Sequence, residues 1–398
     1  MTTFGIITIS TIVFLLYLLL EYVFHIQNLK SIPVRIHVNG TRGKSSVTRL
    51  IAAALREADL KVVAKTTGTI PRLITDQGVE LPVYRLADQP NIIEQLKIVS
   101  FAAKNKANVL VMECMALNPE LQSITELNMI KSTHGIIINT RADHLDVMGP
   151  TERDVTLALL GTTPKNAKLF TSERNYMQEF TMACHDRNSE LIVVSEQDDN
   201  KISDEEMSNF SYMEHKANVA LAIKICQSLN VPKDVALQGM YKVMPDVGAA
   251  HEYTLDVDGV KQVAFINGFA ANDPQSSQEI WDSAIERNQS KPHKIMVINT
   301  RSDRLDRSKQ IAESISNWKL ADKYIIIGSH CLFLIKTAMK QGLSSNLFVN
   351  AEGAKSEMIF DIIMDTFDSS SVVVGIGNIK NEGLELIQFF QNRSQVTT

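Results

Sequence analysis

The sequence predicts an α/β protein with two domains built on parallel sheets, preceded by one transmembrane helix. Three observations predict this fold. A charge-free apolar run fills residues 4–20, strand-like and helix-like segments alternate through the rest of the chain, and a glycine loop joins one strand to a helix. Alternating strands and helices are typical of a parallel sheet covered by helices. The 398 residues suffice for two domains of ordinary size.

The apolar run predicts a retained membrane anchor over residues 1–24. It approaches the ~17–25 residues that span a bilayer, and its apolar side chains lie on every face, unlike those of most core helices. No basic residue precedes it, and Glu21-Tyr22-Val23-Phe24-His25 follows in place of a signal-peptide cleavage site. Lys30 and Arg35 lie after the run, so we expect a single-pass protein of the cell membrane with its domains in the cytoplasm.

The composition of the whole chain separates it from several classes of protein. It is 44% hydrophobic and 21% charged, as in ordinary globular proteins, and its formal net charge is −5. A nucleic-acid partner is not expected, because such a partner favours a basic face. The four cysteines have no Cys-x-x-Cys spacing, which indicates reduced thiols rather than a metal or redox site.

Residues 25–247 are predicted to form the first sheet domain. Its expected strands are 34–38, 62–65, 109–113, 134–139, 168–171 and 191–194, and its expected helices include 45–57, 91–104, 215–229 and 235–243. The polar, acidic segment 197–209 is predicted to be a solvated loop.

Residues 248–398 are predicted to form a smaller, Rossmann-like α/β domain, with the boundary near Pro245-Asp246-Val247-Gly248. Its expected strands are 263–267, 295–299, 324–327, 347–349 and 372–375, and its expected helices are 275–287, 308–318, 332–340, 354–366 and 382–392.

The loop Asn39-Gly40-Thr41-Arg42-Gly43-Lys44-Ser45-Ser46 predicts an ATP site, because it lies between a strand and a helix. Its glycines let backbone N–H groups surround phosphate oxygens, and the helix N-terminus adds partial positive charge. Lys44 is expected at the terminal phosphates and Ser45 on Mg²⁺. The spacing is unusual, since only Thr41 and Arg42 separate the two glycines. A chance Gly-Lys-Ser at a helix start is the alternative.

Three further groups of polar residues follow predicted strands. Glu113 ends an apolar strand, where a carboxylate beside the loop is placed to hold Mg²⁺. Lys65 and Thr67 are expected to bind phosphate or a substrate carboxylate, unless they form a solvent-facing turn. The segment Asn139-Thr140-Arg141-Ala142-Asp143-His144-Leu145-Asp146 suits a metal or phosphate, although by itself a polar loop is the favoured interpretation.

In this order the motifs resemble the Mur ligase superfamily, which includes peptidoglycan amino-acid ligases and folylpolyglutamate synthases. The short Gly40–Ser45 loop matches the form of that family's P-loop. The resemblance implies that Lys44, Glu113 and His144 are catalytic, that Ser45, Glu113 and His144 hold metal, and that Asn218 lies beside adenine.

Longer motifs narrow the resemblance to the ligase subunit of capsular poly-γ-glutamate synthases. They include Lys-Thr-Thr-Gly-Thr at 65–69, Glu-Cys-Met-Ala-Leu-Asn-Pro at 113–119 and Asn-Gly-Phe-Ala-Ala-Asn-Asp at 267–273. The resemblance implies an ATP- and Mg²⁺-dependent, ADP-forming ligase that joins glutamate to the poly-γ-glutamate chain through an acyl phosphate. It also implies small membrane subunits as partners.

The sequence departs from the wider superfamily at two places. Leu159 occupies the position of a carbamylated lysine, and Val247-Gly248-Ala249-Ala250-His251 replaces a linker segment that carries a phosphate-binding arginine. Arg301 or Arg304 is the candidate substitute. With Asp303, these arginines suit carboxylate recognition, or else form a self-paired surface cluster.

Substrate contacts are also expected from Asn267 and Asn272, at an earlier strand end of the same domain. Three alternative functions stay open: a folate- or peptidoglycan-type ligase, a membrane-tethered ATPase that powers polymer export, and a kinase. A kinase would leave a phosphorylated product and make no amide.

Overall fold

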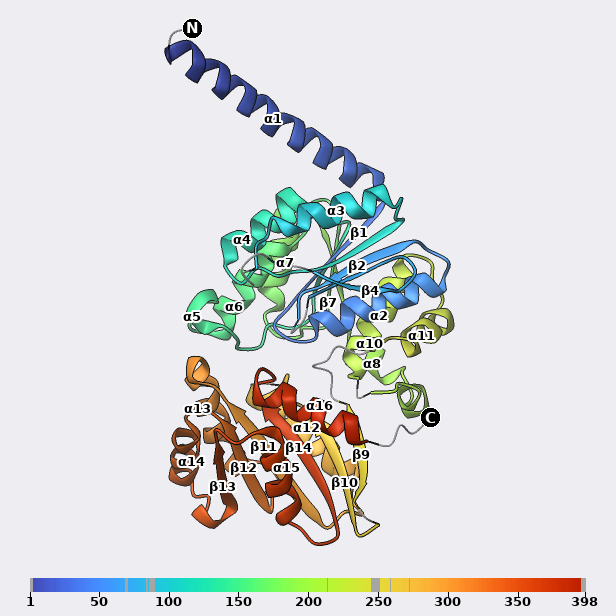
Figure 1. Cartoon of the computed structure of the whole chain (residues 1–398). Helices are drawn as coiled ribbons and strands as arrows, with labels where there is room; N and C mark the ends of the chain where they lie inside the picture. The colour runs from blue at the N-terminus through green and yellow to red at the C-terminus, as the bar shows by residue number, and fades with distance from the viewer. Residues whose placement is uncertain are drawn as a thin grey trace. The chain divides into compact units, whose positions relative to one another are not determined.

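In the computed structural model the chain forms two compact units, residues 1–210 with 215–246, and residues 211–214 with 247–398 (Figure 1). The structure describes residues 3–394 apart from 69–70, 84, 86–89, 213, 245–250, 258 and 272. The predicted boundary at residues 245–248 and the predicted substrate residue Asn272 therefore lie outside the described residues.

The first unit is built on an eight-stranded sheet with the order β4-β3-β2-β5-β1-β6-β7-β8. β2, β5, β1, β6, β7 and β8 pair in parallel. At the other edge, β3 and β4 form an antiparallel hairpin that was not predicted from the sequence. The strands are β1 (Val34–Asn39), β2 (Val62–Thr66), β3 (Arg72–Ile74), β4 (Glu80–Pro82), β5 (Val109–Glu113), β6 (His134–Ile137), β7 (Lys168–Thr171) and β8 (Glu190–Val193).

Helices lie between these strands and after the last of them. They are α2 (Lys44–Glu57), α3 (Glu94–Lys104), α4 (Pro119–Ile124), the π-helix η2 (Thr125–Ile130), α5 (Leu145–Met148), α6 (Glu152–Leu159), the short η3 (Leu160–Thr162), α7 (Met177–Asp186), α8 (Glu196–Asn200), α9 (Asp204–Ser208), α10 (Lys216–Ser228) and α11 (Lys233–Tyr241). Because β2, β5, β1 and β6 are parallel neighbours, the segments that follow them meet at one edge of the sheet.

The prediction of a loop over residues 197–209 is wrong, because α8 and α9 occupy most of this segment. Neither helix buries a residue, so the apolar periodicity that identifies a helix is missing. Each begins instead with a capping box, formed by Ser195 with Asp198 and by Ser203 with Glu206. Reciprocal side-chain and backbone bonds at the N-terminus therefore support these helices locally.

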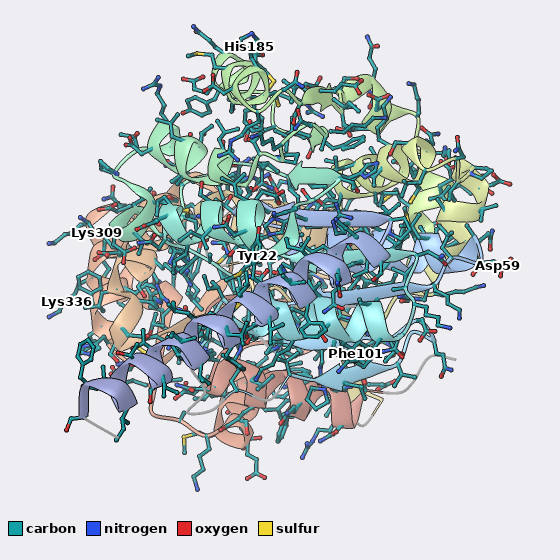
Figure 2. The ribbon with its side chains drawn as sticks, turned by 90° about the horizontal axis from the view of Figure 1, so that it is seen from above. Tyr22, Asp59, Phe101, His185, Lys309 and Lys336 are labelled. Carbon is teal, nitrogen blue, oxygen red and sulfur yellow. The ribbon has the colours of Figure 1, made fainter. Side chains whose placement is uncertain are left out.

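The N-terminal helix α1 (Thr3–Ser31) is long and apolar enough to cross a membrane, and its most apolar stretch is not buried against the protein. Figure 2 shows Tyr22 on this exposed part and Phe101 on α3. The end of α1 differs, since Leu29 packs with Ile32 into the core beside α3. Arg35 of β1 fixes this end by donating to the carbonyls of Leu29 (3.1 Å) and Ile32 (2.7 Å).

The second unit has a six-stranded sheet with the order β13-β12-β11-β14-β10-β9. All its pairs are parallel except the edge pair of β9 (Glu252–Val257) with β10 (Lys261–Asn267). The other strands are β11 (His293–Thr300), β12 (Lys323–Gly328), β13 (Phe348–Glu352) and β14 (Ser370–Gly377).

Buried apolar clusters line both faces of this second sheet. Its helices are α12 (Pro274–Arg287), η4 (Ser302–Arg304), α13 (Leu305–Ser314), η5 (Ile315–Asn317), α14 (Cys331–Lys340), η6 (Ser345–Leu347), α15 (Ser356–Asp365) and α16 (Glu382–Arg393). The five predicted strands of this domain are present within a few residues, and β9 is the one that was missed.

Candidate nucleotide-binding site

The glycine loop lies between β1 and α2, as the sequence predicted. Gly40 has φ +136° and Gly43 has φ +81°, a region that side-chain-bearing residues rarely adopt. A Cβ at Gly40 would lie 3.1 Å from the backbone nitrogen of Ile138, and a Cβ at Gly43 would lie 3.1 Å from Oδ1 of Asn218. Both glycines are therefore needed for conformation and for close packing, and Asn218 of α10 borders the loop.

The beginning of α2 has the features of an anion site. Gly43 precedes the helix without a capping side chain, and the first turn carries no acidic residue. The N-terminal N–H groups of a helix attract phosphate in this setting. Nζ of Lys44 donates to the carbonyls of Gly40 (2.6 Å) and Thr41 (3.3 Å), so the ammonium group lies over the loop.

Glu113 is brought to the loop because β5 pairs with β1 on one side and with β2 on the other. Its Oε2 accepts hydrogen bonds from Oγ of Ser45 (2.8 Å) and from the backbone N–H of Thr67 (2.7 Å). Glu113 is only 1% exposed. The hydroxyl and carboxylate are oxygen donors of the kind that Mg²⁺ prefers, so this pair fits the predicted metal.

Asn139 holds the tip of the loop, a role that the sequence analysis did not assign. Its Oδ1 accepts from Oγ1 of Thr41 (2.7 Å) and from the N–H of Arg42 (3.0 Å), and its Nδ2 donates to the Arg42 carbonyl (3.1 Å). Its place at the end of the predicted strand 134–139, where the 139–146 motif begins, was the available signal.

Farther along the 139–146 segment, Asp143 lies beside the loop and His144 lies next to Asp143. Asp143 is 3.5 Å from the Arg42 guanidinium and 4.0 Å from Nε2 of His144. Within the described residues, no three His, Cys, Asp or Glu side chains form a metal-binding group. The role of His144 as a metal ligand thus stays a prediction. Leu159 is buried in an apolar cluster with Ile137 and offers no ligand.

Glu173 is a second residue that sequence reasoning missed. It follows β7, and its Oε2 accepts from the N–H (2.8 Å) and hydroxyl (3.0 Å) of Thr140. Its Oε1 accepts from the N–H groups of Arg174 (2.8 Å) and Asn175 (2.9 Å). This buried carboxylate anchors the segment that begins at Asn139. An acidic residue just after a strand was the signal, but the pairing partner is distant in sequence.

Lys65 is buried and engaged with other residues. Its ammonium group pairs with Glu94 and contacts Sδ of Met115 (3.6 Å), while Arg85 forms a two-point bond to the same carboxylate (3.0 Å each). Burial lowers the pKa of Lys65, with Glu94 opposing the effect. Burial acts to raise the pKa of Glu94, but the bonds from Arg85 and Lys65 outweigh it and lower that pKa.

In the second unit the predicted substrate residues lie at the carboxyl ends of β10 and β11. Asn267 is buried, and its Oδ1 accepts from the N–H of Phe269 (3.3 Å). Arg301 pairs with Asp303 (2.8 Å), as the self-paired alternative expected, and Arg304 ends the short helix η4. Their contacts with substrate stay predictions.

This geometry defines a P-loop nucleotide-binding protein of the α/β class. Residues 38–245 match the family model described as the Mur ligase middle domain, and residues 252–393 match that of the poly-gamma-glutamate synthase CapB C-terminal domain. The chain therefore belongs to the Mur ligase family, in its CapB poly-γ-glutamate synthase branch.

Named relatives agree with this assignment. The chain is 37% identical to the capsule biosynthesis protein CapB of Bacillus anthracis, over 96% of this chain and 82% of that one. It is 34% identical to the PGA synthase CapB of Bacillus subtilis (strain 168), over 92% of each.

Solved structures share the fold at low identity. A folylpolyglutamate synthase from Thermotoga maritima has a TM-score of 0.63 at 13% identity, over 96% of this chain and 97% of that one. A bifunctional folylpolyglutamate synthase/dihydrofolate synthase from Yersinia pestis, complexed with AMPPNP and Mn ion, has a TM-score of 0.65 at 14% identity, over 94% and 92%.

Proposed function

We propose that this chain, an ATP-dependent amide ligase of poly-γ-glutamate synthesis, activates a glutamate carboxylate as an acyl phosphate at the P-loop edge of its first sheet. Family membership supports the ligase activity. The observation that carries the site is the convergence of Ser45, Glu113 and the Thr67 N–H beside the loop.

The chemistry requires two anions to meet. A γ-carboxylate oxygen attacks the γ-phosphorus of ATP, the bond to ADP breaks, and an acyl phosphate forms. The α-amine of a second glutamate then attacks the acyl carbon, phosphate leaves, and the nitrogen loses a proton as the amide forms. Phosphorylation is needed because an unmodified carboxylate has no adequate leaving group.

The residues of the first unit supply the electrostatic part of this reaction. Lys44 and the α2 N-terminus place positive charge at the phosphates. A Mg²⁺ ion, which Ser45 and Glu113 would hold, neutralises phosphate charge when it is bound. Asn139 fixes the loop so that its N–H groups are oriented before the reaction.

We also propose that α1 anchors the chain in the cell membrane with both units in the cytoplasm. Its length and apolar composition support this location. Small membrane subunits of a poly-γ-glutamate synthase are the proposed partners, and glutamate with the growing polymer is the proposed substrate.

The test measures ADP and γ-linked polymer in membranes that contain the chain and its proposed partners, with Mg²⁺ and glutamate. Glutamate-dependent ADP release with polymer growth is expected, and Lys44→Ala should abolish both. The contrary outcome is ATP hydrolysis that does not depend on glutamate and yields no polymer, with the partners shown to be present. In that case the chain would be an export ATPase and not a ligase.

A further inference from the structure

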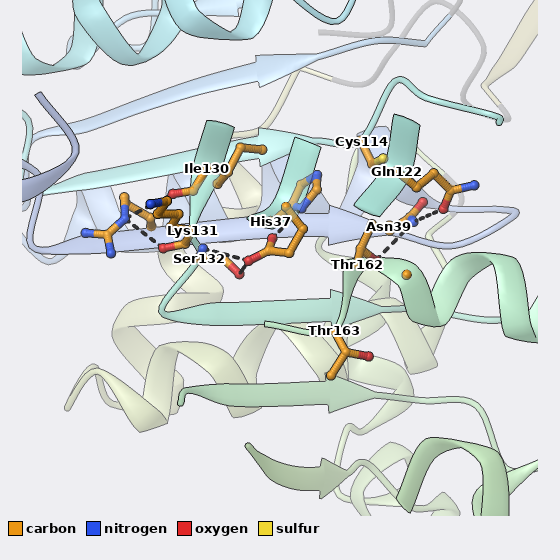
Figure 3. Close-up of polar contacts among 12 residues, drawn as sticks. His37, Asn39, Cys114, Gln122, Ile130, Lys131, Ser132, Thr162 and Thr163 are labelled. Atoms are coloured by element: carbon orange, nitrogen blue, oxygen red, sulfur yellow. Dashed lines mark hydrogen bonds and ion pairs between the residues drawn. The ribbon is translucent and has the colours of Figure 1, made fainter. Parts of the chain in front are cut away.

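A network of buried amides lies beneath the start of the P-loop (Figure 3). Asn39 is the last residue of β1 and is 2% exposed. Its Nδ2 donates to Oε1 of Gln122 (2.8 Å) and to Oγ1 of Thr162 (3.1 Å). Its Oδ1 accepts from the N–H of Gly40 (2.9 Å). The side chain of Asn39, a residue that was predicted to bind ATP, is therefore bonded inside the protein.

Gln122 connects this network to the segment that follows Glu113. It lies in α4 and is fully buried. While its Oε1 accepts from Asn39, its Nε2 donates to the carbonyl of Leu117 (2.9 Å). Leu117 lies between Glu113 and the first residue of α4. A single side-chain amide therefore joins the start of the loop to the connection that leaves the carboxylate.

Thr162 supports Asn39 from a different element. It ends η3, and its hydroxyl donates to the Leu159 carbonyl (2.8 Å) while accepting from Nδ2 of Asn39. α4 follows β5 and η3 follows α6, so two elements that are far apart in the sequence hold the same residue. A buried amide whose groups are all bonded is strongly oriented, because each unmade bond would leave an unpaired polar group.

We propose that Gln122 and Thr162 are positioning residues for the nucleotide site, acting through Asn39 on the first N–H of the loop. The inference rests on the proposed function of this loop. Because only two residues separate its glycines, the loop has little conformational freedom. A shift at Gly40 therefore moves the N–H groups that face phosphate. When these groups are already correctly oriented, ATP binds without the cost of reorganising them.

The test uses the detergent-solubilised full chain and measures the Kd for ATP by calorimetry. Thr162→Val removes the hydroxyl, Thr162→Ser keeps it, and Gln122→Met removes the amide at similar volume. Ser123→Ala is the matched control, because Oγ of Ser123 also joins α4 to η3 through the Gly161 carbonyl (3.1 Å) without reaching Asn39.

Thr162→Val and Gln122→Met should each weaken ATP binding about tenfold, the equivalent of the one buried hydrogen bond to Asn39 that each removes. Thr162→Ser and Ser123→Ala should bind as the wild type does. The KM for glutamate, measured in membranes, should stay unchanged in all four variants. Gln122→Met should also need more Mg²⁺ for half-maximal activity, since it alone loses the Leu117 bond.

Two results would overturn the positioning role. One is an ATP Kd for Thr162→Val and Gln122→Met equal to that of Ser123→Ala. The other is a loss of ATP binding that Thr162→Ser shares, with the unfolding midpoint lowered in proportion. Wild-type membranes that make no polymer, while the variants still lose ATP affinity, would refute the proposed function and leave the positioning role supported.

Discussion

At the scale of single residues, the contacts of Glu113 lead to the clearest prediction about activity. One of its carboxylate oxygens serves both the P-loop serine and the segment after β2. Glu113→Gln keeps the shape but removes the negative charge, so we expect kcat to fall roughly a hundredfold or more with little loss of stability. Polymerisation kinetics across Mg²⁺ concentrations measure this. If Glu113→Gln kept the wild-type kcat, the negative charge of Glu113 would have no part in the mechanism.

His37, in the strand that leads to the loop, predicts a pH dependence of stability. Its Nδ1 lies 2.8 Å from Oε2 of Glu126, and both side chains are buried. Burial acts to lower the pKa of His37, but interactions with Cys114 and Glu126 outweigh it and raise that pKa to about 9. The folded state therefore favours the imidazolium form more than the unfolded chain does.

The stabilisation from His37 is complete below its ordinary pKa of 6.5 and is lost as pH rises from there through about 9. The reference is His37→Gln with Glu126→Gln, which removes both titrating groups together. The wild-type free energy of unfolding, relative to this variant, should fall between pH 6.5 and 9. Urea unfolding at several pH values measures it, and a pH-independent difference would contradict the assignment.

At the scale of elements, the P-loop predicts a difference between two glycines. Gly43 (φ +81°) and Gly78 (φ +80°) share a left-handed backbone. A Cβ at Gly43 would meet Asn218 at 3.1 Å, whereas one at Gly78 would find its nearest neighbour at 3.7 Å. Alanine should destabilise the protein by about 1–2 kcal/mol at either position through the backbone alone.

Only Gly43→Ala should also abolish ATP binding, because the loop must shift to relieve the contact with Asn218. Calorimetric titration with ATP and thermal unfolding separate the two effects. If Gly43→Ala bound ATP no more weakly than Gly78→Ala, the loop would not be the nucleotide site.

Local pattern predicted most of the elements that carry the site. Strand, glycine loop and helix lie next to one another in the sequence, and Glu113 ends an uninterrupted apolar strand. The supports of the site depend instead on residues far apart in the chain. Glu173 meets Thr140 33 positions away, and Gln122 meets Asn39 83 positions away. Such pairings follow from sheet order, which hydrophobic periodicity does not encode.

Short or exposed elements were missed for a related reason. The β3–β4 hairpin has only three residues in each strand, and α8 and α9 bury no side chain. Their support comes from edge pairing and from caps, so they leave no apolar repeat in the sequence. The position of Lys65 at the end of a predicted strand indicated phosphate or substrate binding. Its partner Glu94 comes from a helix 29 residues later, so this pairing could not be read from the local sequence.

At the scale of the whole molecule, the exposed apolar part of α1 predicts membrane attachment. Leu15→Lys with Leu16→Lys places two charges near the centre of the run, each costing about 2.5–3.5 kcal/mol in a bilayer. The chain should move from carbonate-washed membranes to the soluble fraction. Leu320→Lys is the control, because Leu320 is 57% exposed in the second unit. Unchanged membrane retention of the double variant would refute the anchor.

The firm attachment of α1 to the first unit has a further consequence for where the product is made. Leu29 and Ile32 are in the core, Arg35 ties the helix end to β1, and the P-loop begins at the other end of that six-residue strand. Six extended residues span about 20 Å. With α1 in a bilayer, polymer ends would be released into a thin layer at the membrane surface. Neighbouring copies confined to the same plane would then recapture a released end more often than freely diffusing enzymes would, which favours long chains over many short ones.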